Sequence, residues 1–293
     1  MLTRFAPAPT GWLHLGHVLN AEYVWGSGAT VLLRIEDHDR ERCRPRSPAG
    51  ILDDLRWLGY QPDFPVVRQS GRDAIYREAV DLLAAQGLVY GCDCTRREIE
   101  SGIEGRGSRV DEWRVDESNR VFRSANLDPR SSELRYSGRC RDRGLPLTGG
   151  YGWRVRMDPG VERFVDEILG PQEQDPASQC GDVLIRDRLG NWTYQFAASV
   201  DDDRQDVDLV IRGVDLLPST GRQIRLARLL GRERPAAFRH HPLVMKGPEQ
   251  KLSKSDGDTG IRELRARGWT PEQVKAAARL NLQPRGSSLP GGL

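Results

Sequence analysis

Lysine is scarce in this chain of 293 residues. Of 44 basic side chains only four are lysines, at positions 246, 251, 254 and 275, and three of these fall within nine residues. Acidic side chains number 42, so the net charge is only +2 and does not by itself indicate a polyanionic partner. Lysine provides a compact, mobile point charge where arginine provides a rigid planar one. The lysine cluster is therefore a candidate for contact with a charged ligand.

Long apolar runs and an even set of cysteines are also missing. The chain has no stretch of 18 apolar residues, and its N-terminal sequence MLTRFAPAPTG has none of the features of a secretory signal peptide. Five unevenly spaced cysteines do not suggest a disulfide framework. We expect a cytoplasmic protein with reduced thiols and no membrane partner, and we expect it to act as a monomer.

Apolar strands alternate with amphipathic helices in the first part of the chain. Residues 2–6 and 31–35 are short apolar runs typical of buried parallel strands, and residues 15–26 between them favour a helix. Helices are also predicted at residues 47–59 and 72–86, each closed by or followed by a glycine. This alternation indicates right-handed βαβ units and an α/β, doubly wound (Rossmann-type) parallel sheet.

The alternation is interrupted at residues 88–147, a segment rich in Arg, Ser and Gly. We therefore predict a catalytic domain formed by residues 1–87 and 148–218, with residues 88–147 as an inserted subdomain. Residues 219–293 are predicted to form a helical region that contains the KLSKS loop. Within it, Thr270 and Gln273 have the spacing of a helix capping box.

The stretch RFAPAPTGWLHLGH, residues 4–17, lies where the first strand meets the first helix. His14 and His17 stand one helical turn apart near the positive end of the helix, and Gly16 leaves room for a nucleotide to approach the backbone. Two surface histidines or a partial metal site would explain the short motif equally well. The KLSKS sequence at 251–255, which alone is typical of a solvated loop, adds a second source of cations for one triphosphate.

Together these motifs resemble the class I aminoacyl-tRNA synthetases, whose signatures are written HIGH and KMSKS. RIEDHD (34–39), TYQFA (193–197) and VIRGVDLL (210–217) follow the glutamyl branch in order, and the resemblance covers residues 1–94 and 136–260. It implies that glutamate attacks the α-phosphate of ATP to form glutamyl adenylate, with Mg²⁺ on the phosphates. The residues matching catalytic positions are His14, His17 and Lys254. The residues matching the ATP-binding set are His14, Gly16, His17, Lys251 and Lys254.

The same resemblance implies a set of glutamate-binding residues. Glutamate needs cations for its carboxylates and an anion for its ammonium group. By motif position the set comprises Arg4, Ala8, Glu36, Tyr194 and Arg212. The family often has serine where this chain has Ala8, so a hydroxyl contact there is lost or made through the backbone. Asp215 and the acidic run 201–203 also match the branch, but solvated acidic turns explain them equally well and we leave them outside the site.

Cysteines 92, 94 and 140 are candidate metal ligands. Two thiols one residue apart point to the same side of an extended strand, but a tetrahedral ion needs a fourth ligand, and no histidine lies between residues 39 and 239. Reduced thiols on a hairpin would explain the pattern as well. Short paralogues of glutamyl-tRNA synthetase carry Cys-x-Cys followed by Tyr-x-x-x-Cys, and this resemblance implies one structural Zn²⁺ held by Cys92, Cys94, Tyr136 and Cys140. The 41 residues between Cys94 and Tyr136 exceed the spacing expected there.

Only 38 residues follow Ser255, whereas complete glutamyl-tRNA synthetases continue into a helical anticodon-binding domain. We expect that domain to be absent. The closest resemblance is thus to the glutamyl-queuosine tRNA(Asp) synthetases. It implies a ligase that activates glutamate without tRNA and transfers it to the queuosine base in the anticodon loop of tRNA(Asp). The alternatives are a truncated glutamyl-tRNA synthetase that charges the terminal adenosine, and a non-catalytic binding module derived from a synthetase.

Overall fold

A seven-stranded sheet organises the chain in the computed structural model, which describes residues 1–39, 43, 47–104, 135–244 and 260–280. Its strands, in spatial order, are β3 (Val67–Arg68), β2 (Thr30–Ile35), β1 (Leu2–Phe5), β9 (Leu209–Gly213), β10 (Ala237–His241), β6 (Glu162–Asp166) and β7 (Gly170–Gln174). Every neighbouring pair is parallel except β6 with β7. The predicted α/β class with a mostly parallel sheet is confirmed.

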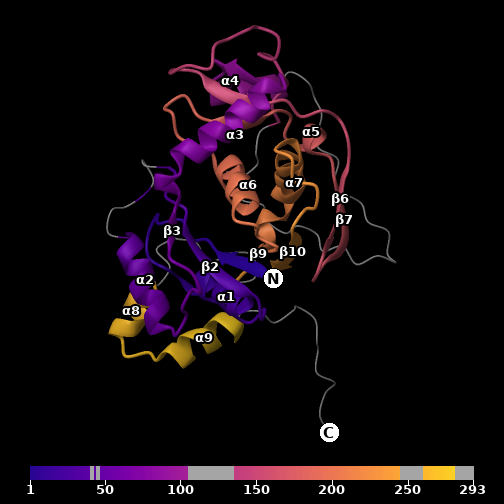
Figure 1. The fold of residues 1–293 in the computed structure, drawn as a ribbon. Helices are drawn as coiled ribbons and strands as arrows, with labels where there is room; N and C mark the ends of the chain where they lie inside the picture. Colours follow the sequence, from indigo (N-terminus) through magenta and orange to yellow (C-terminus); the bar gives the residue numbers. More distant parts are fainter. Residues whose placement is uncertain (40–42, 44–46, 105–134, 245–259, 281–293) are drawn as a thin grey trace.

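Helices lie on both faces of this sheet (Figure 1). One face carries α1 (Leu15–Trp25), α2 (Ser47–Trp57), α8 (Ile261–Ala266) and α9 (Pro271–Leu280), and the other carries α3 (Asp73–Ala85), α6 (Tyr194–Arg204) and α7 (Thr220–Leu229). The predicted helix at residues 72–86 agrees with α3 to within one residue at each end. The predicted capping box of α9 is also confirmed, because the Thr270 N–H donates to Gln273 Oε1 at 2.9 Å and the Gln273 N–H donates to Thr270 Oγ1 at 3.3 Å.

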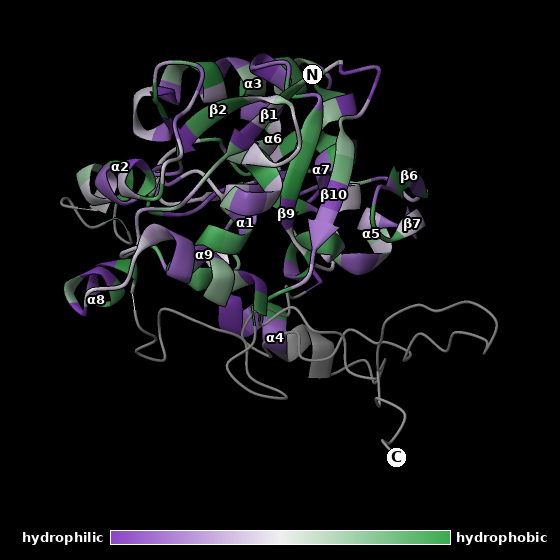
Figure 2. Ribbon diagram, turned by 90° about the horizontal axis from the view of Figure 1, so that it is seen from below, coloured by the Kyte–Doolittle hydropathy of each residue, from purple (hydrophilic) through white to green (hydrophobic). Residues whose placement is uncertain are grey.

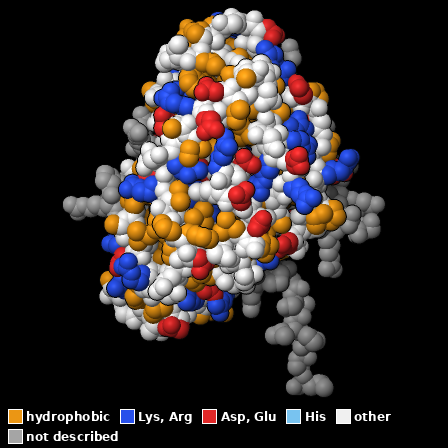
Figure 3. Space-filling model, in the orientation of Figure 1, with side chains coloured by type: hydrophobic (Ala, Val, Ile, Leu, Met, Phe, Trp, Pro, Cys, Tyr) orange, Lys and Arg blue, Asp and Glu red, His pale blue; other side chains and the backbone are white. Residues whose placement is uncertain are grey.

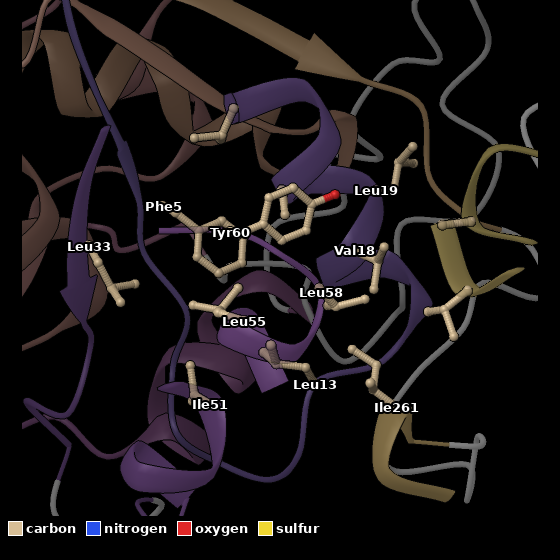
Figure 4. Packing of buried hydrophobic residues seen from close by; sticks show 14 of the residues in the cluster. Phe5, Leu13, Val18, Leu19, Leu33, Ile51, Leu55, Leu58, Tyr60 and Ile261 are labelled. Carbon is tan, nitrogen blue, oxygen red and sulfur yellow. The ribbon is translucent and has the colours of Figure 1, made fainter. Parts of the chain in front are cut away.

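The hydrophobic core beneath α1 fixes the start of that helix. Leu13, Val18 and Leu19 are almost fully buried and belong to one cluster with Phe5 of β1 and Ile51 of α2 (Figure 4). Burial of such side chains contributes about 1.5–3 kcal/mol each. The apolar strand β9 runs through the middle of the molecule in Figure 2. The end of β1 and the beginning of α1 are therefore held rigidly side by side.

A second, antiparallel sheet has the order β4 (Val89–Cys92), β5 (Gly152–Val155) and β8 (Val183–Arg186). Near it are α4 (Arg96–Glu104) and α5 (Pro176–Gln179), while the 3-10 turns η1 (Gln69–Gly71) and η2 (Val214–Ser219) belong to the connections of the main sheet. β4 thus lies inside the segment predicted as an insertion, residues 88–147, and pairs with β5 just after it. The domain boundaries themselves stay a prediction.

The surface of the described part is mixed in charge. Basic and acidic side chains are interspersed on the face drawn in Figure 3, in keeping with the small net charge. Each helix within the described residues is too short or too polar to span a bilayer.

Candidate functional site

The two histidines of the HLGH motif cap the first helix together. His14 is the N-cap residue of α1, and its Nδ1 accepts a hydrogen bond from the Gly16 N–H at 3.1 Å. His17 Nδ1 in turn accepts from the His14 N–H at 3.2 Å, and the two ring centroids lie 4.0 Å apart. Since both Nδ1 atoms are acceptors, each neutral ring carries its hydrogen on Nε2. That tautomer can donate to a phosphate oxygen.

Gly16, which is predicted to let a nucleotide approach the backbone, also leaves space for a neighbouring side chain. A Cβ atom at this position would lie 3.0 Å from Cε1 of His14. The glycine therefore makes room for the His14 ring in its capping position, which the sequence pattern alone did not indicate.

Lys251 and Lys254, together with the rest of residues 245–259, lie outside the described residues. The chain on both sides of them is anchored beside α1. Val244 belongs to the same core cluster as Leu13, and Gly260 forms a β-bridge with His14. The Ile261 N–H also donates to the Leu13 carbonyl at 2.9 Å. These contacts place both flanks of the KLSKS segment beside α1, and the role of Lys254 stays a prediction.

Arg212 is a buried cation at the end of β9. Its Nε donates to His240 Nε2 at 3.0 Å, Nη1 to Gln223 Oε1 at 2.5 Å and Nη2 to Thr220 Oγ1 at 2.7 Å. Only 3% of its surface is exposed, and burial lowers the pKa of its guanidinium. Among the described residues no carboxylate forms an ion pair with Arg212. A buried guanidinium in this situation is suited to a carboxylate ligand.

Arg4 and Glu36 are connected through two residues that the sequence motifs did not assign. Asp202 Oδ1 lies 3.1 Å from Arg4 Nε and 2.8 Å from Arg34 Nη1. Arg34 Nη2 lies 3.3 Å from Glu36 Oε1. Because Arg4 already has Asp202 as an anionic partner, Arg212 is the stronger candidate for a substrate carboxylate. Burial raises the pKa of Glu36, so a bound ammonium group would favour its ionised form.

Tyr194 lies among the same charged groups. The charges of Arg212, Glu36 and Arg4 all act on its hydroxyl. Burial is the largest influence and raises the pKa of Tyr194. Ala8 lies three residues beyond the end of β1. The carbonyl of the preceding residue, Pro7, accepts a hydrogen bond from the Glu36 N–H at 3.1 Å. The structure therefore brings Arg4, Glu36, Tyr194 and Arg212 together, with Ala8 close in the chain; their role in binding glutamate stays a prediction.

Of the two explanations left open for residues 201–203, the structure contradicts the solvated acidic turn for two of the three residues. Asp201 and Asp202 lie on α6 and are 0% and 8% exposed. Asp201 accepts hydrogen bonds from Arg72 Nε at 2.6 Å and from Tyr76 Oη at 2.8 Å. The available signal was Arg34, because an arginine inside the apolar strand VLLRI needs a buried anionic partner. Asp215 is exposed in η2.

The cysteines of the predicted metal site form a cluster. The sulfur atoms of Cys92, Cys94 and Cys140 all lie within 4.8 Å of one another, and those of Cys94 and Cys140 are 3.5 Å apart. Sulfur ligands of a tetrahedral Zn²⁺ would stand about 3.8 Å apart for Zn–S bonds of about 2.3 Å. Tyr136 Oη lies 3.5 Å from Cys92 Sγ and 3.8 Å from Cys94 Sγ. The three thiols could therefore hold a metal ion, and zinc with Tyr136 as its fourth ligand stays a prediction.

Basic groups surround this cluster. Arg154 Nε donates to Cys92 Sγ at 3.3 Å, and its guanidinium lies 3.7 Å from the centre of the Tyr136 ring. Burial and the hydrogen bond with Cys140 raise the pKa of Cys94 to about 12. Burial also opposes ionisation of Cys92, but its interactions with Tyr136 and Arg154 outweigh burial and lower the pKa of this thiol. A thiolate, the form that binds metal, is favoured there.

Comparison with known proteins identifies the family. Residues 1–288 match the family described as tRNA synthetases class I (E and Q), catalytic domain. The chain belongs to this family of ligases. It is 43% identical over 261 residues to the glutamyl-Q tRNA(Asp) synthetase of Bordetella bronchiseptica. This match covers 87% of this chain and 75% of the relative. The enzyme of the same name from Rhodobacter capsulatus is 37% identical over 291 residues, or 94% of this chain and 98% of the relative.

Solved structures of longer synthetases have the same fold. A glutamate tRNA ligase from Elizabethkingia meningosepticum, in complex with its amino acid, superposes with a TM-score of 0.68 and 28% sequence identity. The glutamate-tRNA synthetase of Elizabethkingia anophelis gives a TM-score of 0.69. The match covers 93% of this class I chain but only 59% of each of the longer ones.

A cavity of about 660 Å³ lies between the second sheet and the beginnings of α6 and α7. Its charged lining residues are Arg96, Arg154, Arg188, Arg222, Asp182 and Asp187. Gln195 also lines it, and Gln195 Oε1 accepts from Gln223 Nε2 at 2.9 Å. Since Gln223 accepts from Arg212, two hydrogen bonds connect the cavity with the Arg212 guanidinium.

Proposed function

We propose that this class I synthetase activates glutamate with ATP in the absence of tRNA and then transfers the glutamyl group to the queuosine base of tRNA(Asp). The observation that carries the proposal is Arg212, a buried guanidinium whose described neighbours include no carboxylate partner. The names of the relatives at 43% and 37% identity support the choice of tRNA(Asp).

In the proposed first step, a carboxylate oxygen of glutamate forms a bond to the α-phosphorus of ATP and pyrophosphate leaves. Arg212 would bind one carboxylate of glutamate and Glu36 its ammonium group. The Nε2–H groups of His14 and His17, with the positive end of α1, would stabilise negative charge on the phosphate oxygens. Lys254 would add a further cation, and magnesium bound with ATP would neutralise phosphate charge. Catalysis would then rest on alignment and charge stabilisation rather than on a covalent enzyme intermediate.

For the second step we propose that the acceptor nucleoside enters the cavity beside Gln195. A volume of about 660 Å³ is within the range of pockets that hold small organic ligands. Four arginines against two aspartates in its lining suit the approach of an RNA backbone.

We also propose that Cys92, Cys94, Tyr136 and Cys140 hold one structural zinc ion. Such an ion would tie the end of β4 to the turn at residues 136–140, next to this cavity. Structural zinc sites with closed ligand sets contribute directly to folding.

Pyrophosphate exchange tests the first step. With L-glutamate and ATP but no tRNA, the purified protein should incorporate labelled pyrophosphate into ATP; a binding module without activity would give none. Transfer is tested with labelled glutamate and tRNA(Asp) that carries or lacks queuosine. Label that requires queuosine and maps by nuclease digestion to the anticodon loop supports the proposal. Label at the terminal adenosine would instead assign the chain to ordinary charging of tRNA.

A further inference from the structure

A chain of buried hydrogen bonds leads from Asp166 through His240 to Arg212. Asp166 Oδ2 lies 2.7 Å from His240 Nδ1, and His240 Nε2 lies 3.0 Å from Arg212 Nε. The three residues come from β6, β10 and β9, and they are 1%, 0% and 3% exposed. No feature of the sequence motifs pointed to Asp166 or His240.

The hydrogen positions in this chain follow from the donors and acceptors. Asp166 Oδ1 accepts from the N–H groups of Ile168 and Leu169, both at 2.9 Å, and Oδ2 accepts the His240 N–H at 3.0 Å. These bonds favour a carboxylate, so His240 Nδ1 must be a donor. Arg212 can only donate, so His240 Nε2 must be an acceptor. Only a neutral imidazole with its hydrogen on Nδ1 meets both requirements.

The charges around the ring agree with this assignment. Burial lowers the pKa of His240, and the charge of Arg212 lowers it further against the opposing effect of Asp166. Burial raises the pKa of Asp166, but the bonds from His240 and from the two backbone groups outweigh it, so that the pKa of Asp166 is lowered.

The consequence concerns the orientation of Arg212. A guanidinium has five N–H groups, and His240, Thr220 and Gln223 each take one from a different nitrogen of Arg212. Each terminal nitrogen keeps a second N–H beyond these three bonds. The plane of the guanidinium is thus fixed before any substrate arrives.

We propose that His240 and Asp166 are positioning residues that hold Arg212 in the orientation required to bind a carboxylate of glutamate. This inference rests on the proposed function only in naming glutamate as the ligand. Loss of the hydrogen-bonded residue behind a metal ligand typically costs about 10- to 100-fold in metal affinity, and we expect a loss of the same order for the support behind Arg212. His240→Phe should therefore raise the dissociation constant of L-glutamate, measured by calorimetry, about 10- to 100-fold.

The neighbouring residue provides a matched control. His241 is 3% exposed on the same strand, but its ring stacks on Tyr23 of α1 at 4.9 Å, on the other side of the sheet from Arg212. His241→Phe keeps an aromatic ring for that contact and should leave glutamate affinity unchanged. His240→Gln offers an amide oxygen to Arg212 and should recover part of the lost affinity. His240→Asn, too short to reach Arg212, replaces the phenylalanine variant if that protein does not fold.

Two amide analogues separate positioning from general loosening. L-Glutamine lacks the side-chain carboxylate of glutamate, and the α-amide of glutamate lacks the α-carboxylate. In the His240→Phe variant, the ratio of the analogue's dissociation constant to that of glutamate should fall for one of the two analogues only. KM for ATP in pyrophosphate exchange should stay within about threefold of the wild-type value, far below the loss of affinity expected for glutamate. Parallel weakening of all three ligands, or unchanged glutamate affinity in folded variants, would overturn the inference. Glutamate binding by the wild type without exchange would refute the proposed reaction alone, whereas no glutamate binding would refute both.

Discussion

Replacing Asp202 with asparagine should destabilise the folded chain by about 2 kcal/mol at pH 7. The magnitude comes from the two arginines that share this carboxylate. Burial raises the pKa of Asp202, but the charges of Arg4 and Arg34 outweigh burial and lower it to about 2 from its ordinary 3.8. A difference of one unit between the pKa of a group in the folded state and its pKa in the unfolded state corresponds to about 1.4 kcal/mol of stability. The carboxylate is 8% exposed, so solvent screens this interaction only weakly.

The pH dependence gives the sharper test. Because the folded pKa of Asp202 lies below the unfolded one, its contribution is complete above about pH 4 and is lost as the pH falls through about 2. Urea unfolding followed by circular dichroism should therefore show a constant deficit for Asp202→Asn from pH 5 to pH 8. The deficit should narrow below pH 4.

Asp203→Asn is the matched control for this experiment. Asp203 is the next residue on α6, is only half-buried and has a pKa that burial raises. Its replacement should leave stability unchanged or slightly higher. Equal losses in the two variants, or a loss below about 0.5 kcal/mol for Asp202→Asn, a value typical of ordinary surface substitutions, would refute the reasoning.

Four further predictions concern separate parts of the molecule. Gly16→Ala should displace the His14 ring and lower pyrophosphate exchange by about tenfold or more without loss of stability, because alanine favours a helix, whereas Gly71→Ala, with no atom within 4 Å of its Cβ, should not affect exchange. Asp54→Asn should stabilise the protein at pH 7.5 by on the order of 2 kcal/mol. Burial raises the folded pKa of Asp54 to about 6, so the wild type gains stability as the pH falls from 7 to 4 and the two melting curves should converge there. Cys140→Ser should abolish the one equivalent of zinc that elemental analysis is expected to find in the wild type, while Cys180→Ser, outside the cluster, should retain it. Leu189→Asp at the cavity should raise KM for tRNA roughly fivefold at low salt and leave exchange unchanged, whereas Val165→Asp, at a similarly exposed position on β6, should change neither KM for tRNA nor exchange.

Local patterns in the sequence were sufficient for features built from neighbouring residues. The ends of α3, the capping box of α9 and the shared side of Cys92 and Cys94 all depend on spacings of a few residues. The pairing of Arg34 with Asp202 spans 168 residues, and that of His240 with Asp166 spans 74. Such contacts depend on which strands become neighbours in the sheet, and no local periodicity contains that information. The motif resemblance named the groups predicted to face the substrate but not the residues that hold them in place.

The hydrogen-bonded pair β4 and β5 has a consequence for how this family can vary. Strand residues Cys92 and Gly152 are directly paired, so the chain leaves and re-enters the second sheet at one point. Closing a longer loop between fixed ends adds only about 0.6 kcal/mol for each doubling of its length. The length of the chain between these two strands can therefore change at small thermodynamic cost, while the pairing of Cys92 with Gly152 keeps its two ends together.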